Sequence, residues 1–117
     1  MTMLDPAERS ARGRAIQAEV TGHSPPARTP VEQSWRDFVF AEVWSRPGLD
    51  RRARYLVAIA GAVLAGADDA IVAGYLRGAL SGGELSPGEL REAALHLSVY
   101  GGWPRGQALD GAIGRVL

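Results

Sequence analysis

Two stretches of this sequence decide its fold: Glu-Val-Trp-Ser-Arg-Pro-Gly-Leu-Asp-Arg-Arg at residues 42–52 and His-Leu-Ser-Val-Tyr-Gly-Gly-Trp-Pro at residues 96–104. In the first, Pro47-Gly48 ends one helix near Ser45, and Asp50 caps the next because its side chain can accept from free amides. In the second, a helix ends at a Gly-Gly pair. Both stretches therefore predict short connections between helices.

The rest of the chain also predicts helices. Asp5-Pro6, Thr29-Pro30 and Ser86-Pro87 each pair a capping side chain with proline at the first helical position. No stretch alternates with period two, so strands are not expected. The expected class is all-α, as a single domain over residues 1–117, with an N-terminal helix and Pro-rich linker at 1–30 and a helical core at 31–117. The expected helices cover residues 6–20, 30–45, 51–64, 68–80, 87–100 and a short sixth from 103.

Two features of these helices carry further expectations. From Tyr55 onward the third helix is apolar on every face, which predicts the buried central helix of the domain. Gly61, Gly74 and Gly78 lie inside predicted helices, where each costs about 1 kcal/mol relative to alanine. They indicate either close helix crossings or room left for a ligand.

Composition excludes several classes of function. The chain has 117 residues, 46% hydrophobic, with 13 basic and 13 acidic side chains, which disfavours disorder and nucleic-acid binding. All basic residues are arginine, so Schiff-base chemistry is excluded, and the absence of cysteine excludes thiolate nucleophiles and disulfides. The two histidines show no metal-ligand spacing, so we expect no metal. Phosphate-loop and dinucleotide-binding motifs are also absent, so we expect no cofactor.

Nothing in the sequence indicates a membrane protein or a secreted one. Residues 1–5 lack the order of a signal peptide. The longest apolar stretch, residues 55–66, is 12 residues, whereas a spanning helix needs about 20. We expect a cytoplasmic protein.

His96 is the first candidate for acid-base chemistry. Glu92, His96 and Tyr100 fall at i, i+4 and i+8, beside a core-facing stripe on the same helix. An imidazole between a carboxylate and a phenol suits proton transfer near neutral pH. The alternative is an interface histidine hydrogen-bonded to Glu92. The core-facing stripe comprises Leu90, Ala93, Ala94, Leu97 and Gly101.

Glu42 is the second candidate. It falls within the apolar stripe predicted for the second helix, which comprises Trp35, Phe38, Val39 and Val43. Apolar surroundings would raise the pKa of its carboxyl toward that of a general acid. The alternative is an ion pair with an arginine near Arg46 or Arg51.

Arginines and tryptophans surround the two turns. Arginine can clamp a substrate carboxylate through two parallel hydrogen bonds, and a tryptophan can either wall a pocket or pack in the core. The residues concerned are Arg46, Arg51, Arg52, Arg54, Trp44 and Trp103.

Together the two opening stretches resemble the carboxymuconolactone decarboxylase family, over about residues 13–117. The resemblance implies an all-helical homo-oligomer, a trimer or hexamer, with active sites near subunit contacts. It also implies cofactor-independent decarboxylation of a small carboxylated lactone or enolisable acid, in which the enzyme stabilises and protonates a dienolate. On this basis the expected catalytic residues are His96, Glu42 and Tyr75, and the expected substrate-binding residues are Arg46, Arg51, Trp44, Tyr100 and Trp103.

The sequence departs from the family pattern at two places. The Cys-x-x-Cys and following histidine of the peroxidase-like branch fall at Asp68, Ile71 and Tyr75, which excludes peroxide or disulfide reduction. The decarboxylase branch usually has a histidine where this chain has Tyr75, which can serve as a hydrogen-bond donor or acid but, with an ordinary pKa of about 10, not as a good base. The resemblance therefore implies a related but different substrate.

Two alternative functions stay open. One is a tailoring isomerase or cyclase that uses the same pocket for enolisation. The other is a catalytically silent binding or assembly subunit, since a fold does not guarantee its usual chemistry. Release of carbon dioxide separates a decarboxylase from both.

Overall fold

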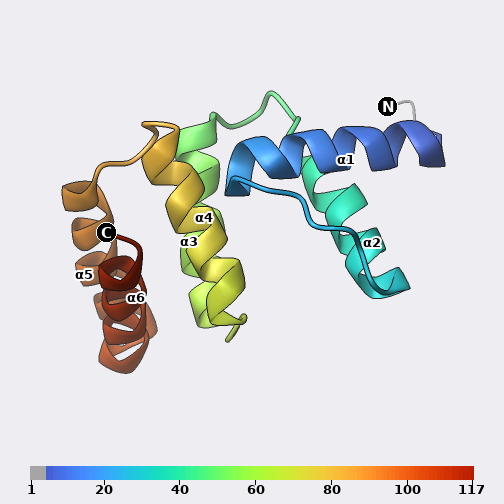
Figure 1. Ribbon diagram of the computed structural model, residues 1–117. Helices are drawn as coiled ribbons and strands as arrows, with labels where there is room; N and C mark the ends of the chain where they lie inside the picture. The colour runs from blue at the N-terminus through green and yellow to red at the C-terminus, as the bar shows by residue number, and fades with distance from the viewer. Residues whose placement is uncertain (1–4) are drawn as a thin grey trace. The chain divides into compact units, whose positions relative to one another are not determined.

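The computed structural model describes residues 5–117, and within that range every regular element is a helix (Figure 1). The all-α expectation is confirmed. The described elements are α1 (Pro6–Thr21), α2 (Pro30–Arg36), the π-helix η1 (Asp37–Val43), α3 (Arg51–Leu64), α4 (Asp69–Ser81), α5 (Pro87–Gly101) and α6 (Trp103–Val116). None of the helices in residues 5–117 is long and apolar enough to cross a membrane.

The helices form two compact units that divide between Leu49 and Asp50, inside the first of the two deciding stretches. The assignment of residues 1–117 to one domain stays a prediction.

The helix starts follow the predicted caps. The side chains of Asp5, Thr29, Asp50 and Ser86 each accept a hydrogen bond from an amide of the first turn. Of these four, only Ser86 forms the complete capping box, in which its own amide also donates to the Glu89 carboxylate. These four helix starts are therefore stabilised by bonds between residues two or three positions apart, whereas α4 and α6 begin without a side-chain cap.

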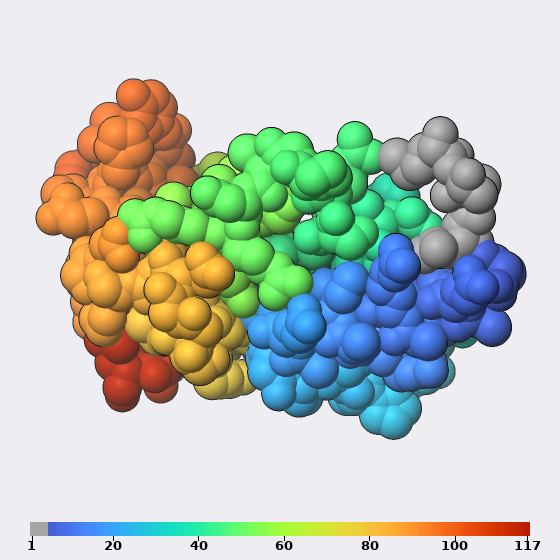
Figure 2. All heavy atoms as spheres, turned by 90° about the horizontal axis from the view of Figure 1, so that it is seen from above, coloured from blue at the N-terminus to red at the C-terminus, as the bar shows by residue number. Residues whose placement is uncertain are grey.

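In the first unit, α1 packs along α2 and η1 (Figures 1 and 2). The ring of Phe40 is fully buried, stacks on Trp44 at 6.3 Å between centroids, and meets Trp35 edge-on at 5.4 Å. Val20 of α1 is also fully buried. Aromatic packing of this kind contributes about 0.5–1.5 kcal/mol per pair beyond the area it buries.

The π-helix corrects the predicted face of this segment. The sequence predicts one α-helix over residues 30–45 with Trp35, Phe38, Val39 and Val43 facing the core. In the structure Phe38 is 60% exposed, and the buried side chains are instead Arg36, Asp37, Phe40, Ala41 and Trp44. The amide of Trp44 bonds to the carbonyl of Val39, five residues back, so each turn is wider and the core face recurs every four or five residues.

In the second unit, α3 packs against α4, α5 packs against α6, and α6 also contacts α3 and α4. Its core includes Tyr55, Leu76, Leu90 and Ile113. The prediction that α3 is buried on every face is wrong. Only Tyr55, Ile59 and Val63 are buried, and Val57 is 66% exposed. The sixth helix is also longer than the short one predicted, because it pairs with α5 along its length.

The closest helix crossing in the second unit occurs at Gly106, not at Gly61. A Cβ on Gly106 would lie 1.6 Å from Ser98 Oγ and 3.0 Å from Ser98 Cα, whereas a Cβ on Gly61 meets nothing within 4 Å. Ser98 is buried and donates to the carbonyl of Ala94, so its side chain has little freedom to move. The crossing explanation therefore fails for Gly61 and applies to Gly106.

We expect Gly106→Ala to lower the free energy of unfolding by about 1–3 kcal/mol, because the added methyl group forces α5 and α6 apart. The matched control is Gly111→Ala on the same helix, where the nearest atom is the end of the Arg115 side chain at 3.4 Å. That variant should be neutral or slightly more stable, because alanine favours helix. Denaturant melts of both variants test this, and equal stabilities would contradict a close crossing at Gly106.

Candidate active site

Glu42 lies on η1 and is held by α1. The Nε of Arg9 donates to Glu42 Oε1 at 3.1 Å, and the two side chains are 26% and 17% exposed. The ion-pair alternative is thus found, with Arg9 as the partner rather than an arginine near Arg46 or Arg51. Among residues 5–117, no other hydrogen bond to the Glu42 carboxylate occurs, so its Oε2 retains its accepting capacity.

A second carboxylate, Asp37, lies five residues earlier on the same π-helix. Its Oδ2 accepts from Ser10 Oγ at 2.6 Å and its Oδ1 accepts from Arg36 Nε at 2.9 Å. Burial alone would raise the pKa of Asp37, but the bonds from Ser10 and Arg36 and the charges of Arg36 and Arg14 outweigh it and hold the pKa below its ordinary value. With both oxygens bonded, Asp37 fixes α1 to η1 and is not suited to proton transfer.

We expect Asp37→Asn to lower the free energy of unfolding by about 2 kcal/mol at pH 7, because it weakens charge-assisted bonds to the buried Arg36. Since the folded-state pKa is lowered, this contribution is present above the unfolded pKa and is lost as pH falls through the folded value. The difference between wild type and variant should therefore shrink below about pH 4. Melts across pH 3–7 test this; a difference that stays constant to pH 3 would contradict it.

His96 lies on the exposed face of α5. Its ring is 5.1 Å from that of Tyr100, at an interplanar angle of 41°, and Tyr100 is 79% exposed. The predicted core stripe of α5 is confirmed at Leu90, Ala94 and Leu97. Within residues 5–117 no hydrogen bond joins His96 to Glu92. His96 and Tyr100 thus share an open surface.

Tyr75 lies in the core of the second unit. It is 5% exposed on α4, and burial, with a smaller contribution from Tyr55, raises its pKa to about 12. The phenol is therefore neutral at physiological pH and can act only as a hydrogen-bond donor or acceptor. Because α4 packs against α3 and α6 rather than along α5, Tyr75 and His96 are not brought together within this unit.

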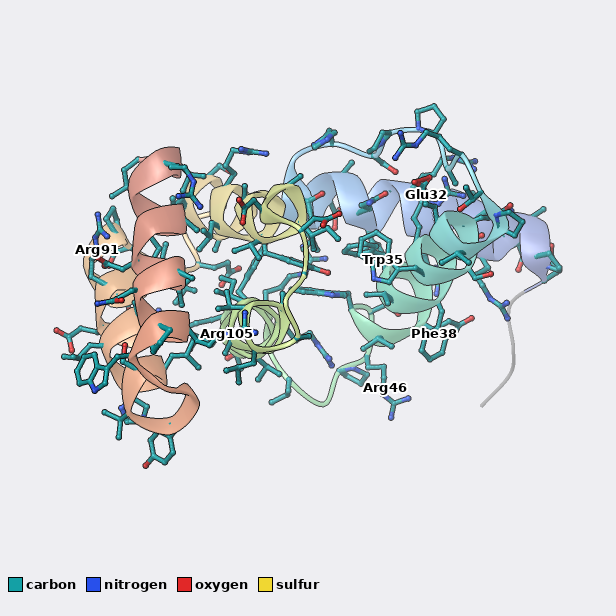
Figure 3. All side chains as sticks on the ribbon, turned by 90° about the horizontal axis from the view of Figure 1, so that it is seen from below. Glu32, Trp35, Phe38, Arg46, Arg91 and Arg105 are labelled. Atoms are coloured by element: carbon teal, nitrogen blue, oxygen red, sulfur yellow. The ribbon has the colours of Figure 1, made fainter. Side chains whose placement is uncertain are left out.

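The predicted substrate-binding residues lie in different environments. Arg46 is exposed and points away from its turn (Figure 3), while Arg51 is half-buried. Arg52 is held by Glu89 and by the carbonyl of Glu84. Trp44 is buried against Phe40, whereas Trp103 is 59% exposed. Trp44 therefore packs in the core of the first unit, and of these two tryptophans only Trp103 has a ring exposed for binding.

An open apolar groove on α2 and η1 was not expected from the sequence. Trp35 and Phe38 border it (Figure 3), together with Pro30, Val31, Ser34 and Val39. Its only signal in the sequence is the apolar stripe of residues 35–43, which an α-helical period places in the core. The groove has no ionisable lining side chain, so by itself it offers no acid or base. Residues 5–117 contain no cluster of three or more side chains able to hold a metal ion.

The chain belongs to the carboxymuconolactone decarboxylase family, whose model matches residues 30–113. It is 34% identical over 110 residues to a 4-carboxymuconolactone decarboxylase of Acinetobacter baylyi, an alignment covering 86% of this chain and 81% of the relative. It is 35% identical over 80 residues to nitrosuccinic acid decarboxylase npaB of Metarhizium robertsii, covering 68% of this chain and 54% of that relative. The chain thus spans about half the length of this second protein. No solved structure matches the chain.

Both relatives are decarboxylases. The expectation of an enzyme of the carboxy-lyase type is confirmed at this level, and neither relative favours an isomerase, a cyclase or a silent subunit. The expected site residues stay predictions.

Proposed function

We propose that this protein decarboxylates a small acid whose carboxylate lies near an electron-withdrawing group. The alignment with a decarboxylase over 86% of the chain carries the proposal. The names 4-carboxymuconolactone and nitrosuccinic acid share a carboxylic acid and an electron-withdrawing group, a lactone in one and a nitro group in the other. Loss of carbon dioxide from such an acid leaves an electron pair that this group delocalises, and the enzyme must then return a proton to carbon.

Glu42 and His96 are the proposed proton-transfer residues. Glu42 keeps one carboxylate oxygen outside any hydrogen bond among the described residues, and the His96 imidazole is exposed. We assign to Arg46 and Arg51 the binding of a substrate carboxylate, because a guanidinium can hold it bidentately. Trp44 stabilises the end of η1 by stacking on Phe40. Tyr75 is neutral at pH 7, so we assign it only a hydrogen-bonding role.

The test is release of carbon dioxide from 4-carboxymuconolactone and from nitrosuccinic acid by the purified chain without added cofactor. Stoichiometric release from at least one of the two acids is expected, and release from nitrosuccinic acid without release from the lactone would agree with the different substrate that Tyr75 implies. Consumption of substrate without carbon dioxide would instead establish an isomerase or cyclase, and binding without consumption would establish a silent subunit.

The surface around His96 supports the proposal of a homo-oligomer, a trimer or hexamer. Leu95, Val99 and Tyr100 on the same helix and Trp103 at the start of α6 are 54%, 67%, 79% and 59% exposed. Contiguous apolar patches on a protein surface commonly mark sites where another molecule binds. A second copy covering them would also exclude water from His96.

We expect light scattering at micromolar concentration to give the mass of several chains. Val99→Arg should shift the protein toward the monomer, because a charge in an apolar interface is costly to desolvate. Ala70→Arg on the exposed face of α4 is the matched control and should keep the assembly. A wild-type chain that is monomeric under these conditions would contradict the oligomer.

A further inference from the structure

We propose that Arg9, on the N-terminal helix α1, is a positioning residue for Glu42. It holds one carboxylate oxygen so that the other is presented to the substrate. This inference rests on the proposed function, since it assigns Arg9 a part in the same proton transfer. Arg9 lies outside residues 30–113, the segment that the family model matches.

The first step of the argument is the form of the contact. Arg9 bonds through Nε to Oε1 alone, rather than through the two-point fork that arginine and carboxylate form when both oxygens are engaged. Oε2 has no further donor among the described residues. A carboxylate fixed at one oxygen and open at the other can accept or deliver a proton without a change of side-chain position.

The second step is the way α1 is held against η1. Ser10, next to Arg9 in sequence, donates to Asp37, and a Cβ on Gly13 would lie 3.1 Å from the Asp37 Cα. Asp37 and Glu42 are five residues apart, the separation of one π-helical hydrogen bond, and both carboxylates accept from α1, Asp37 from Ser10 and Glu42 from Arg9. The buried Asp37 contact thus sets the register in which Arg9 reaches Glu42.

The third step is burial. The Arg9 and Glu42 side chains are each less than one third exposed, so water competes with the contact less than it does at an open surface pair. Misplacement of a catalytic group by about 1 Å can cost about 100-fold in rate. Loss of Arg9 should therefore act on turnover through the orientation of Glu42.

The experiment measures carbon dioxide release from the acid that the wild-type chain turns over, for Arg9→Ala, Arg9→Lys and the control Arg12→Ala. Arg12 is exposed on the same helix and takes no part in the ion pairs described. We expect Arg9→Ala to lower kcat about 10- to 100-fold with KM little changed. Added guanidinium should restore part of the lost activity of Arg9→Ala. Arg9→Lys should retain part of the wild-type kcat, and Arg12→Ala should behave as wild type.

A double variant separates this inference from the proposed function. If Arg9 acts through Glu42, then Arg9→Ala combined with Glu42→Gln should be no slower than Glu42→Gln alone. A large loss in Glu42→Gln with wild-type kcat in Arg9→Ala overturns the role of Arg9 and leaves the proposed function standing. A loss in Arg9→Ala that guanidinium does not restore, accompanied by a lower melting temperature, identifies a structural pair and also overturns it. A wild-type chain that releases no carbon dioxide from either acid overturns both proposals.

Discussion

Replacement of His96 by asparagine is expected to lower the rate of carbon dioxide release about 10²- to 10⁴-fold, the usual contribution of a positioned general acid or base. Asparagine remains polar and close in size, but it cannot exchange a proton near pH 7. His96 projects from the exposed face of α5, and no hydrogen bond from residues 5–117 holds its ring. The substitution should therefore leave the folded core unchanged.

The measurement is steady-state turnover together with light scattering, so that a loss of assembly is not mistaken for a loss of chemistry. Glu92→Gln is the matched control on the same face of α5. Because no hydrogen bond links Glu92 to His96, this variant should keep most of the activity. Wild-type turnover in His96→Asn, with a large loss in Tyr75→Phe, would contradict the assignment to His96 and move the proton transfer to Tyr75.

The helix boundaries could be predicted from the sequence because capping is local. Asp5, Thr29, Asp50 and Ser86 each bond to an amide two or three residues away, so a short window of sequence contains all the partners. Likewise, the spacing of His96 and Tyr100 placed both on one face of a helix, and their rings are adjacent in the structure. In a regular α-helix such as α5, local spacing therefore predicts which residues share a face.

The face of residues 37–43 could not be predicted in the same way. An α-helical period assigns Phe38 to the core, whereas π-helical bonding exposes it and buries Asp37 and Phe40. The wider turn depends on what packs against it, and the buried Asp37 is satisfied only by Ser10, 27 residues earlier, and by its neighbour Arg36. A contact at that distance in sequence leaves no periodic signal.

The partner of Glu42 was missed for the same reason. The sequence allows an ion pair at this position, but it points to the nearby Arg46 and Arg51 as partners. The structure supplies Arg9, 33 residues away. Composition could not select it, because the chain contains 13 arginines and the choice among them depends on how α1 docks.

Replacement of Glu42 by glutamine is expected to lower turnover about 10²- to 10⁴-fold while the free energy of unfolding changes by about 1 kcal/mol or less. Glutamine has the same shape, and its carbonyl oxygen can still accept from Arg9 Nε. The amide cannot take up or release a proton, so the substitution removes the chemistry and keeps most of the contact. Turnover and a denaturant melt of the same preparation give the two quantities.

Glu42→Asp is the complementary variant, because it keeps a carboxylate but withdraws it by one methylene from Arg9. If position matters as well as charge, its turnover should fall between wild type and Glu42→Gln, with the loss in kcat rather than in KM. A marked loss of stability in Glu42→Gln with unchanged turnover would instead make the carboxylate a structural partner of Arg9. Proton transfer would then rest on His96 alone, whose exposure on α5 requires a second surface to complete the site.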